Sequence, residues 1–240
     1  NILGRLGRRF YGGGVRHVPA SFVEKLIPIP GVGERVAFGS HNNFIPKDPR
    51  NAAAVMLPVC SQGDEVGLLY AKRTNKVGTH KGQVCFPGGK VDEGIDETVL
   101  CTALRETEEE MGFHIEPDQV LGMLPMALSI HRMDVTPVVA YVGDLESLTI
   151  SLNPREVESY FWVSVGNLAN PDFQEHDRIA DVESIQRLYD ELNVSRSHPC
   201  RKRTKRYVAG PFPIWGLTAH FTSLFLNAYA PKGVCPPSPP

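Results

Sequence analysis

A short acidic segment holds the residues whose types and spacing point most directly to chemistry. Residues 101–113 read CTALRETEEEMGF and place Glu106, Glu109 and Glu110 at positions i, i+3 and i+4. On a helix these carboxylates project from one face, where like charges repel each other. Two interpretations are open: a solvated helix face, or a site where a divalent cation neutralises the carboxylates. Because oxygen ligands without cysteine or histidine favour hard cations, the second interpretation indicates Mg²⁺ or Mn²⁺.

The neighbouring residues include features that would fix the position of such a helix in the fold. The opposite stripe is apolar and predicts packing on a core; its members are Val99, Leu100, Ala103, Leu104 and Met111. Asp96 is expected to be the N-cap, and Arg105 stands one turn before Glu109, where the two can pair. The preceding segment FPGGKVDEG contains a Gly-Gly turn, where backbone amides and carbonyls can approach phosphate and metal.

The order GG…RETEEEMGF resembles the Nudix box. The matching residues are Arg105, Glu106, Glu109, Glu110, Gly112 and Phe113, with Thr107 at a usually apolar position. Glu97 stands eight residues before Arg105, as in the box, but Gly89 stands eight before Glu97, so the loop is longer than usual.

The resemblance implies an α/β (α+β) fold, a Nudix-type α/β/α sandwich with a mixed sheet. It also implies hydrolysis of a nucleoside diphosphate linked to another group. The implied catalytic residues are Arg105, Glu106, Glu109 and Glu110, and the implied ligands of Mg²⁺ or Mn²⁺ are the three glutamates and the Gly89 carbonyl. Which carboxylate acts as the base stays open.

The segment before the box is similar to coenzyme A diphosphatases. The matching residues are Leu69, Arg73, Gly82, Phe86, Pro87, Gly88 and Gly89, and the segments 155–168 and 214–219 also resemble that branch. The likeness implies coenzyme A or acyl-CoA as the substrate and 3′,5′-ADP and phosphopantetheine as the products of coenzyme A. The implied substrate-binding residues are Arg73, Gly82, Phe86, Gly88 and Gly89. Gly78 stands where the branch has a second arginine, so either Lys76, Lys81 or another cation replaces that charge or the substrate differs.

A basic run offers a competing hypothesis. It consists of Arg201, Lys202, Arg203, Lys205 and Arg206, and it suits a solvated loop, a protein partner or an RNA. The N-terminal arm is a second candidate contact for such a partner. The alternatives are therefore a mitochondrial RNA 5′ pyrophosphohydrolase, an mRNA-stability factor, or a Nudix-fold subunit of a mitochondrial RNA–protein assembly.

Composition narrows the class of protein. The chain has 240 residues, 42% hydrophobic content and a net charge of −2, which does not suit a general polyanion binder. No apolar run reaches the length of about eighteen residues that a membrane-spanning helix needs. The five cysteines are scattered without a CxxC pair, which argues against a disulfide framework or a zinc site and favours a reducing compartment. No acid precedes Glu24 in an Arg-rich start, which is typical of a mitochondrial presequence or its remnant, or else of a loose basic arm.

The chain divides by composition into an N-terminal arm (1–50), a hydrolase domain (51–230) and a Pro-rich tail (231–240). Strands are expected at 52–60, 66–74, 83–89, 119–130, 134–143 and 157–165, with further helices at 21–27, 180–192 and 212–229. Trp162 and Trp215 are expected in the core. His80 is expected to be a structural loop residue, with a phosphate contact or a catalytic base as the alternatives.

Overall fold

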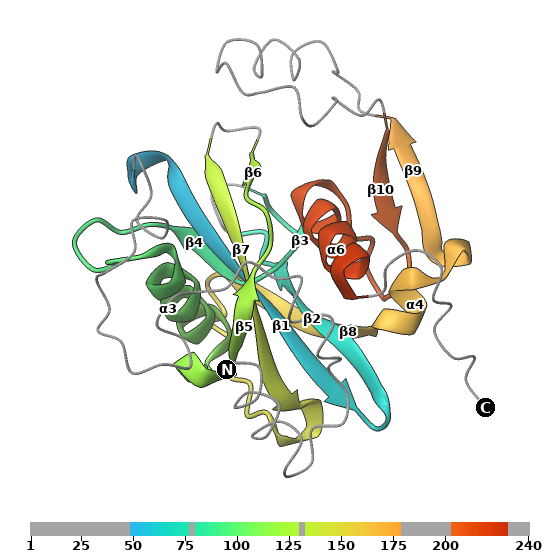
Figure 1. Cartoon of the computed structure of the whole chain (residues 1–240), viewed down its shortest axis with the longest axis horizontal. Coiled ribbons are helices and arrows are strands. Elements are labelled where there is room, and N and C mark those ends of the chain that lie inside the picture. The colour runs from blue at the N-terminus through green and yellow to red at the C-terminus, as the bar shows by residue number, and fades with distance from the viewer. Residues whose placement is uncertain (1–48, 77–79, 130–132, 179–202, 230–240) are drawn as a thin grey trace, which may run out of the picture.

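A mixed β-sheet with a helix on each face forms the centre of the fold (Figure 1). The structure is a computed structural model, and it describes residues 49–76, 80–129, 133–178 and 203–229. The sheet contains β1 Ala52–Gln62, β2 Glu65–Arg73, β3 Val84–Cys85, β4 Gly88–Lys90, β5 Val120–Met123, β6 Ala127–Leu128, β7 Asp134–Asp144 and β8 Val157–Ser164. Its order is β3-β2-β1-β7-β5, with β4 paired to β1, β6 to β7 and β8 to β2. Strands β1 and β7 run parallel and the other pairs antiparallel, so the predicted mixed sheet is confirmed.

The central strand β1 is covered on both faces, which is why the fold is a three-layer sandwich. Nearly every residue of β1 is buried, because both of its faces are covered and its sequence is accordingly a continuous apolar run. Leu57 and Val59 point into one hydrophobic cluster, and Met56 and Cys60 into another. Helix α6, Gly216–Tyr229, packs on the first face, and helix α3, Val99–Met111, on the second (Figure 1).

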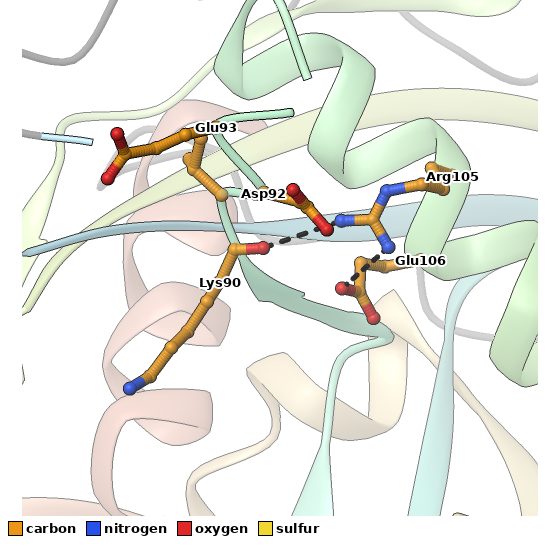
Figure 2. A pocket seen from close by; sticks show the side chains of 6 residues that line it. Lys90, Asp92, Glu93, Arg105 and Glu106 are labelled. Atoms are coloured by element: carbon orange, nitrogen blue, oxygen red, sulfur yellow. Dashed lines mark hydrogen bonds and ion pairs between the residues drawn. The ribbon is translucent and has the colours of Figure 1, made fainter. Parts of the chain in front are cut away.

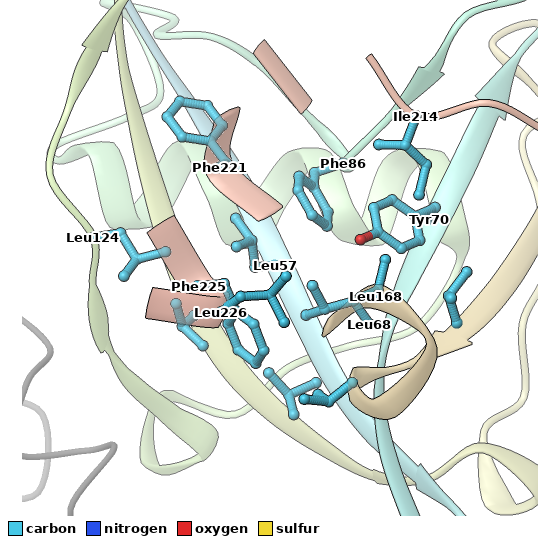
Figure 3. Packing of buried hydrophobic residues seen from close by; sticks show 14 of the residues in the cluster. Leu57, Leu68, Tyr70, Phe86, Leu124, Leu168, Ile214, Phe221, Phe225 and Leu226 are labelled. Atoms are coloured by element: carbon cyan, nitrogen blue, oxygen red, sulfur yellow. The ribbon is translucent and has the colours of Figure 1, made fainter. Parts of the chain in front are cut away.

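The first cluster ties α6 to the sheet through aromatic side chains (Figure 3). The Tyr70 ring stacks on Phe86 and Phe161, with centroids 4.8 and 5.3 Å apart. Its hydroxyl forms a hydrogen bond of 3.0 Å with Thr222 of α6. Tyr70, which lies in the segment before the box, is therefore a core residue.

Two predicted strands are each divided in the structure. The stretch 83–89 gives β3, which pairs with β2, and β4, which pairs with β1, with Pro87 between them. The stretch 119–130 gives β5 and β6, separated around Pro125. Proline has no amide hydrogen for the ladder, and each break lets the chain change its pairing partner or register.

The C-terminal part differs more from expectation. Helix α6 begins at Gly216 rather than 212, because Ile214 pairs with Tyr207 as a β-bridge and Gly216 has a φ of 63°. Trp215 is 45% exposed, so its prediction as a core residue was wrong, whereas Trp162 packs at the edge of the second cluster. A two-stranded ribbon of β9 Gln174–Arg178 and β10 Arg203–Tyr207 was not predicted. The short elements are α4 Val165–Ala169 and the 3₁₀ turns η1 Pro49–Asn51, η2 Pro117–Gln119, η3 Leu145–Ser147 and η4 Pro171–Phe173.

Several predictions lie outside the described residues. They are the N-terminal arm with its helix at 21–27, the helix at 180–192, Gly78, Arg201, Lys202 and the Pro-rich tail. The division into arm, domain and tail stays a prediction. No helix in the described ranges has both the length and the apolar character needed to cross a membrane.

Candidate active site

The carboxylate helix α3 is fixed at both ends by local contacts. The Thr98 hydroxyl accepts a hydrogen bond of 3.2 Å from the Cys101 amide, so Thr98 is the N-cap and the prediction of Asp96 was wrong. Gly112 ends the helix with a left-handed φ of 73°, and its amide donates to the Glu108 carbonyl. A Cβ at Gly112 would overlap the Ser151 carbonyl, so the helix end also packs closely on the loop before β8. These contacts fix the direction in which the glutamates point.

The three glutamates of the predicted site differ strongly in exposure. The side chain of Glu109 is 55% exposed, that of Glu106 16% and that of Glu110 1%. A solvated helix face would leave all three open to water. The interpretation of this face as merely solvated is therefore wrong for Glu106 and Glu110.

Glu110 is the most deeply buried of the three and has two specific donors. The Gly88 amide donates to Oε2 at 3.1 Å, and Arg73 Nη1 donates to Oε1 at 3.3 Å. Burial raises the pKa of Glu110 to about 7, against the lowering effects of Arg73 and the Gly88 amide and with added repulsion from Glu106 and Glu156. The charged form of this carboxylate is therefore poorly compensated in the protein alone.

Glu106 lies directly against the second glycine of the turn. A Cβ at Gly89 would overlap the Glu106 carboxylate, so only glycine leaves room for that group. Arg105 Nη1 donates to Glu106 Oε1 at 3.0 Å and to Glu109 Oε2 at 3.1 Å. Burial raises the pKa of Glu106; Arg105 opposes the shift, and Glu109 and Glu156 add to it.

Arg105 is held from behind by Asp96. Its Nε and Nη2 donate to the two Asp96 oxygens at 2.9 and 2.8 Å, a bidentate pair. Asp96 also accepts from the Thr102 hydroxyl and the Asp92 amide, and the Lys90 carbonyl accepts from Arg105 (Figure 2). Burial alone would raise the pKa of Asp96, but these hydrogen bonds, led by that from Arg105, lower it. Glu97, the residue at the box spacing, is exposed, so the carboxylate that binds Arg105 from this loop is the adjacent Asp96.

We expect Asp96→Asn to destabilise the fold and to lower turnover, because Arg105 would lose its charged, bidentate partner. The loss in the free energy of unfolding should be about 2 kcal/mol, as for other hydrogen bonds to charged groups. Turnover should fall about tenfold as Glu106 and Glu109 lose their fixed neighbour. Chemical denaturation and steady-state kinetics measure the two effects.

Glu97→Gln is the matched control, since it removes a carboxylate from the adjacent, exposed position. It should change neither quantity. If Glu97→Gln were the damaging change and Asp96→Asn the harmless one, the role of Asp96 as the partner of Arg105 would be refuted.

A fourth carboxylate, Glu156, was missed by sequence reasoning. It lies in the loop before β8, and its amide and carbonyl are bonded to the Asn153 carbonyl (3.0 Å) and the Thr74 amide (2.8 Å). The Asn153 amide in turn donates to the Glu110 carbonyl at 3.0 Å, so this loop packs on the end of α3. Glu156 is close enough to raise the pKa of both Glu106 and Glu110. A single glutamate after an Asn-Pro turn carries no local signal, so only the packing reveals it.

The raised pKa of Glu110 gives a testable pH dependence without added cation. Its pKa is about 7 in the folded protein, against an ordinary value of 4.5, so the folded state holds this proton more tightly. Its contribution to stability is therefore complete below about pH 4.5 and is lost as the pH rises through about 7. The free energy of unfolding of the wild type should fall by up to about 3 kcal/mol across this range relative to Glu110→Gln. Urea titrations in a chelator would measure it, and parallel pH profiles for both proteins would contradict it.

The predicted substrate-binding residues have different environments. Arg73, Gly88 and Gly89 lie at the carboxylates, whereas Phe86 is buried in the hydrophobic cluster that packs against α6. Gly82 has a φ of 65°, which suits the turn before β3.

His80 belongs to the same turn. It also has a positive φ, of 55°, and its ring nitrogen Nδ1 forms a hydrogen bond of 2.9 Å with Gln83. These contacts agree with the loop-residue interpretation of His80.

An open hollow of about 440 Å³ adjoins the carboxylates (Figure 2). It is lined by Lys90, Val91, Asp92, Glu93, Arg105 and Glu106. Within the described ranges no three acidic, histidine or cysteine side chains are grouped so as to hold a metal ion. The glutamates of α3 are paired with arginines instead: Glu106 and Glu109 form ion pairs with Arg105, and Glu110 forms one with Arg73.

Comparison with known proteins gives consistent matches. A family model of the NUDIX domain matches residues 49–182. The chain is 35% identical over 181 residues to the mitochondrial coenzyme A diphosphatase NUDT8 of Mus musculus, covering 75% of this chain and 79% of that protein. The same protein of Homo sapiens is 34% identical over 186 residues, 75% of this chain and 70% of its own length. The peroxisomal coenzyme A diphosphatase NUDT7 of Mus musculus is 31% identical over 140 residues, 58% of this chain and 54% of that protein.

Proposed function

The chain belongs to the Nudix family of pyrophosphohydrolases, and from this premise we propose that it cleaves the diphosphate bond of coenzyme A or an acyl-CoA. One observation carries the proposal beyond the family. Glu106 and Glu110 converge on the Gly88–Gly89 turn beside an open hollow that a lysine lines. Together with the similarity to coenzyme A diphosphatases, this arrangement favours an anionic diphosphate substrate over a neutral one.

The donor set fits a hard divalent cation. Burial and mutual repulsion raise the pKa of both Glu106 and Glu110, and their cationic partners in the described residues are Arg105 and Arg73. We assign Glu106, Glu109, Glu110 and the Gly89 carbonyl as ligands for Mg²⁺ or Mn²⁺. When bound, such an ion lowers the pKa of a water molecule and neutralises charge on the phosphate oxygens.

The protein's own groups then divide the remaining work. Arg105, clamped by Asp96, keeps Glu106 and Glu109 in place. Glu110 accepts a hydrogen bond on each oxygen and is assigned as a ligand of the cation, so we assign the base to a different carboxylate. Glu109 and Glu156 are more open, and one of them accepts the proton of the attacking water. The water oxygen bonds to one phosphorus, the bridging P–O bond breaks, and coenzyme A yields 3′,5′-ADP and phosphopantetheine.

Exposed lysines supply positive charge for the substrate. Lys90 lines the hollow, and Lys76 and Lys81 flank the segment that contains Gly78, where the coenzyme A branch has an arginine. Lysine binds phosphate as a point charge without the paired geometry of arginine. We propose that these lysines replace the missing guanidinium.

A hydrolysis panel tests the substrate assignment. Coenzyme A, acetyl-CoA, NADH, a dinucleoside tetraphosphate and 5′-triphosphate RNA would be incubated with Mg²⁺, and the products identified by mass. We expect the coenzyme A compounds to give the highest kcat/KM and 3′,5′-ADP as the common product. Preferential hydrolysis of the RNA or the dinucleotide would overturn the assignment while leaving the family intact.

Divalent cations should stabilise the fold, because they bind the folded carboxylate cluster and not the unfolded chain. At about a hundred times the Kd the gain is about 2.7 kcal/mol, which raises Tm by several degrees. Differential scanning fluorimetry with increasing Mg²⁺ measures the shift. The effect should disappear when Glu106, Glu109 and Glu110 are all changed to glutamine.

Glu108→Gln is the control for that experiment. Glu108 lies on the same helix but pairs with His114 at 2.9 Å on the exposed side. Its substitution should leave the Mg²⁺ response unchanged. An equal loss of response in both variants would assign the effect to the general charge of the helix.

We propose a mitochondrial location, supported by the Arg-rich start of the sequence and by the names of the NUDT8 relatives. The RNA alternative rests on the basic run and on the glycine at position 78, where the coenzyme A branch has an arginine. Two of its cations are engaged within the ribbon: Arg206 pairs with Glu175 at 3.7 Å, and Lys205 donates to Gln174 at 3.0 Å. No observation therefore favours RNA over coenzyme A.

A further inference from the structure

Arg73 combines three features that the proposed reaction leaves unexplained. It ends β2 where the ladder to β8 shifts register, and its amide is bonded to the Gln83 carbonyl at 2.9 Å. Its side chain reaches Glu110 of α3 and is 20% exposed. Its Nε is buried and has no hydrogen-bond partner among the described residues. The backbone of Arg73 is thus fixed, whereas its guanidinium is incompletely bonded because Nε has no partner.

The pair that Arg73 forms with Glu110 is looser than the neighbouring arginine pair. Arg73 Nη1 lies 3.3 Å from a single Glu110 oxygen. This distance is longer than the N–O distance of about 2.7–2.9 Å that is usual between charged groups. Arg105 and Asp96 are joined by two bonds, of 2.8 and 2.9 Å. The geometry therefore indicates that Arg105 and Asp96 stay paired, whereas Arg73 can be replaced as the partner of Glu110.

Glu110 cannot leave its place when the pair opens. Its other oxygen is held by the Gly88 amide, and its side chain is 1% exposed. A buried carboxylate without a counter-ion is costly. Any cation that replaces Arg73 must therefore approach the same oxygen.

We propose that Arg73 is a positioning residue that acts as the resident counter-ion of Glu110, and that a divalent cation must displace it in order to bind. This inference rests on the proposed function, in which Glu110 holds the cation. Arg73 has two opposite effects. It stabilises the cation-free protein, and it weakens the apparent affinity for the cation because the two positive groups compete.

The test is a Mg²⁺ titration of Tm, without substrate, at a pH of about 9, where carboxylates are ionised. Arg73→Gln should lower Tm in chelator and reduce the half-saturating Mg²⁺ concentration about tenfold, which is 1.4 kcal/mol. Arg73→Lys keeps the charge and should stay within about twofold of the wild type. In a Glu110→Gln background, Arg73→Gln should no longer change the half-saturating concentration.

Lys72→Gln is the matched control for charge alone. Lys72 is the adjacent residue, but its amine pairs with Glu158 at 2.6 Å and lies over the Phe212 ring rather than at Glu110. Its substitution removes one positive charge from the same strand and should leave the Mg²⁺ titration unchanged.

The outcomes separate this inference from the proposed function. If the wild type ignores Mg²⁺, the cation site itself is refuted, and the inference with it. If the wild type responds and Arg73→Gln binds Mg²⁺ with equal or weaker affinity, only the role of Arg73 is refuted. If Arg73→Gln is unfolded in chelator, Mg²⁺ should restore the fold, and failure to do so refutes the inference.

Discussion

Changing Glu110 to glutamine should abolish most of the hydrolytic activity while leaving the fold intact. We expect kcat to fall by about 10²-fold or more, equivalent to at least about 2.7 kcal/mol of activation free energy. Glutamine keeps the size of the side chain and can still accept from one of the two donors, Gly88 or Arg73, through its single oxygen. It lacks the charge that holds a divalent cation. Because burial raises the pKa of Glu110, the neutral side chain should be tolerated or even stabilising at neutral pH. Steady-state kinetics and thermal unfolding measure the two effects.

Glu108→Gln is again the control, because it makes the same chemical change two residues away on the exposed side of α3. It should retain the kcat of the wild type. Wild-type turnover by Glu110→Gln at saturating Mg²⁺ would remove Glu110 from the catalytic site.

Changing Gly89 to alanine should have a comparable effect on activity by a different route. The added methyl group would occupy the space of the Glu106 carboxylate. That carboxylate is the end of a flexible side chain, so the protein can fold by moving it aside. A misplacement of about 1 Å at a catalytic group can cost about 10²-fold in rate. We therefore expect kcat to fall by about this factor, with a Tm close to that of the wild type.

Gly94→Ala is the matched control in the same loop. An added Cβ there would meet only Asp92 Oδ1, at 3.4 Å, which is an ordinary contact. It should leave both kcat and Tm unchanged. If Gly89→Ala retained full activity, Glu106 would not need its present position for catalysis.

The sheet and its two helices were largely predictable because their signals are local. The apolar runs of β1 and of its neighbours β2 and β7, and the apolar stripe of α3, follow from local hydrophobic patterns. Boundaries were less predictable where two signals compete. Pro87 and Pro125 divided apolar runs that looked continuous, and Thr98 capped α3 although Asp96 is also a good N-cap residue.

Asp96 shows that a match in spacing does not by itself identify a contact. Glu97 matches the box spacing, yet it is exposed, and the adjacent Asp96 binds Arg105 in the loop before α3. The extra loop length was readable from the sequence, but its effect on orientation was not.

By itself the sequence determined that a helix with three glutamates on one face follows a Gly-Gly turn, since helix geometry and glycine chemistry act over a few residues. Only the tertiary structure decided which glutamate is buried and which groups compensate its negative charge. Glu110 meets Gly88 and Arg73 from 22 and 37 residues away, and these contacts exist because β4 and β3 pair with different strands. Glu156 reaches the same carboxylates from the loop that packs on the end of α3. Burial, charge compensation and pKa depend on groups that approach through space, and no local pattern encodes that approach.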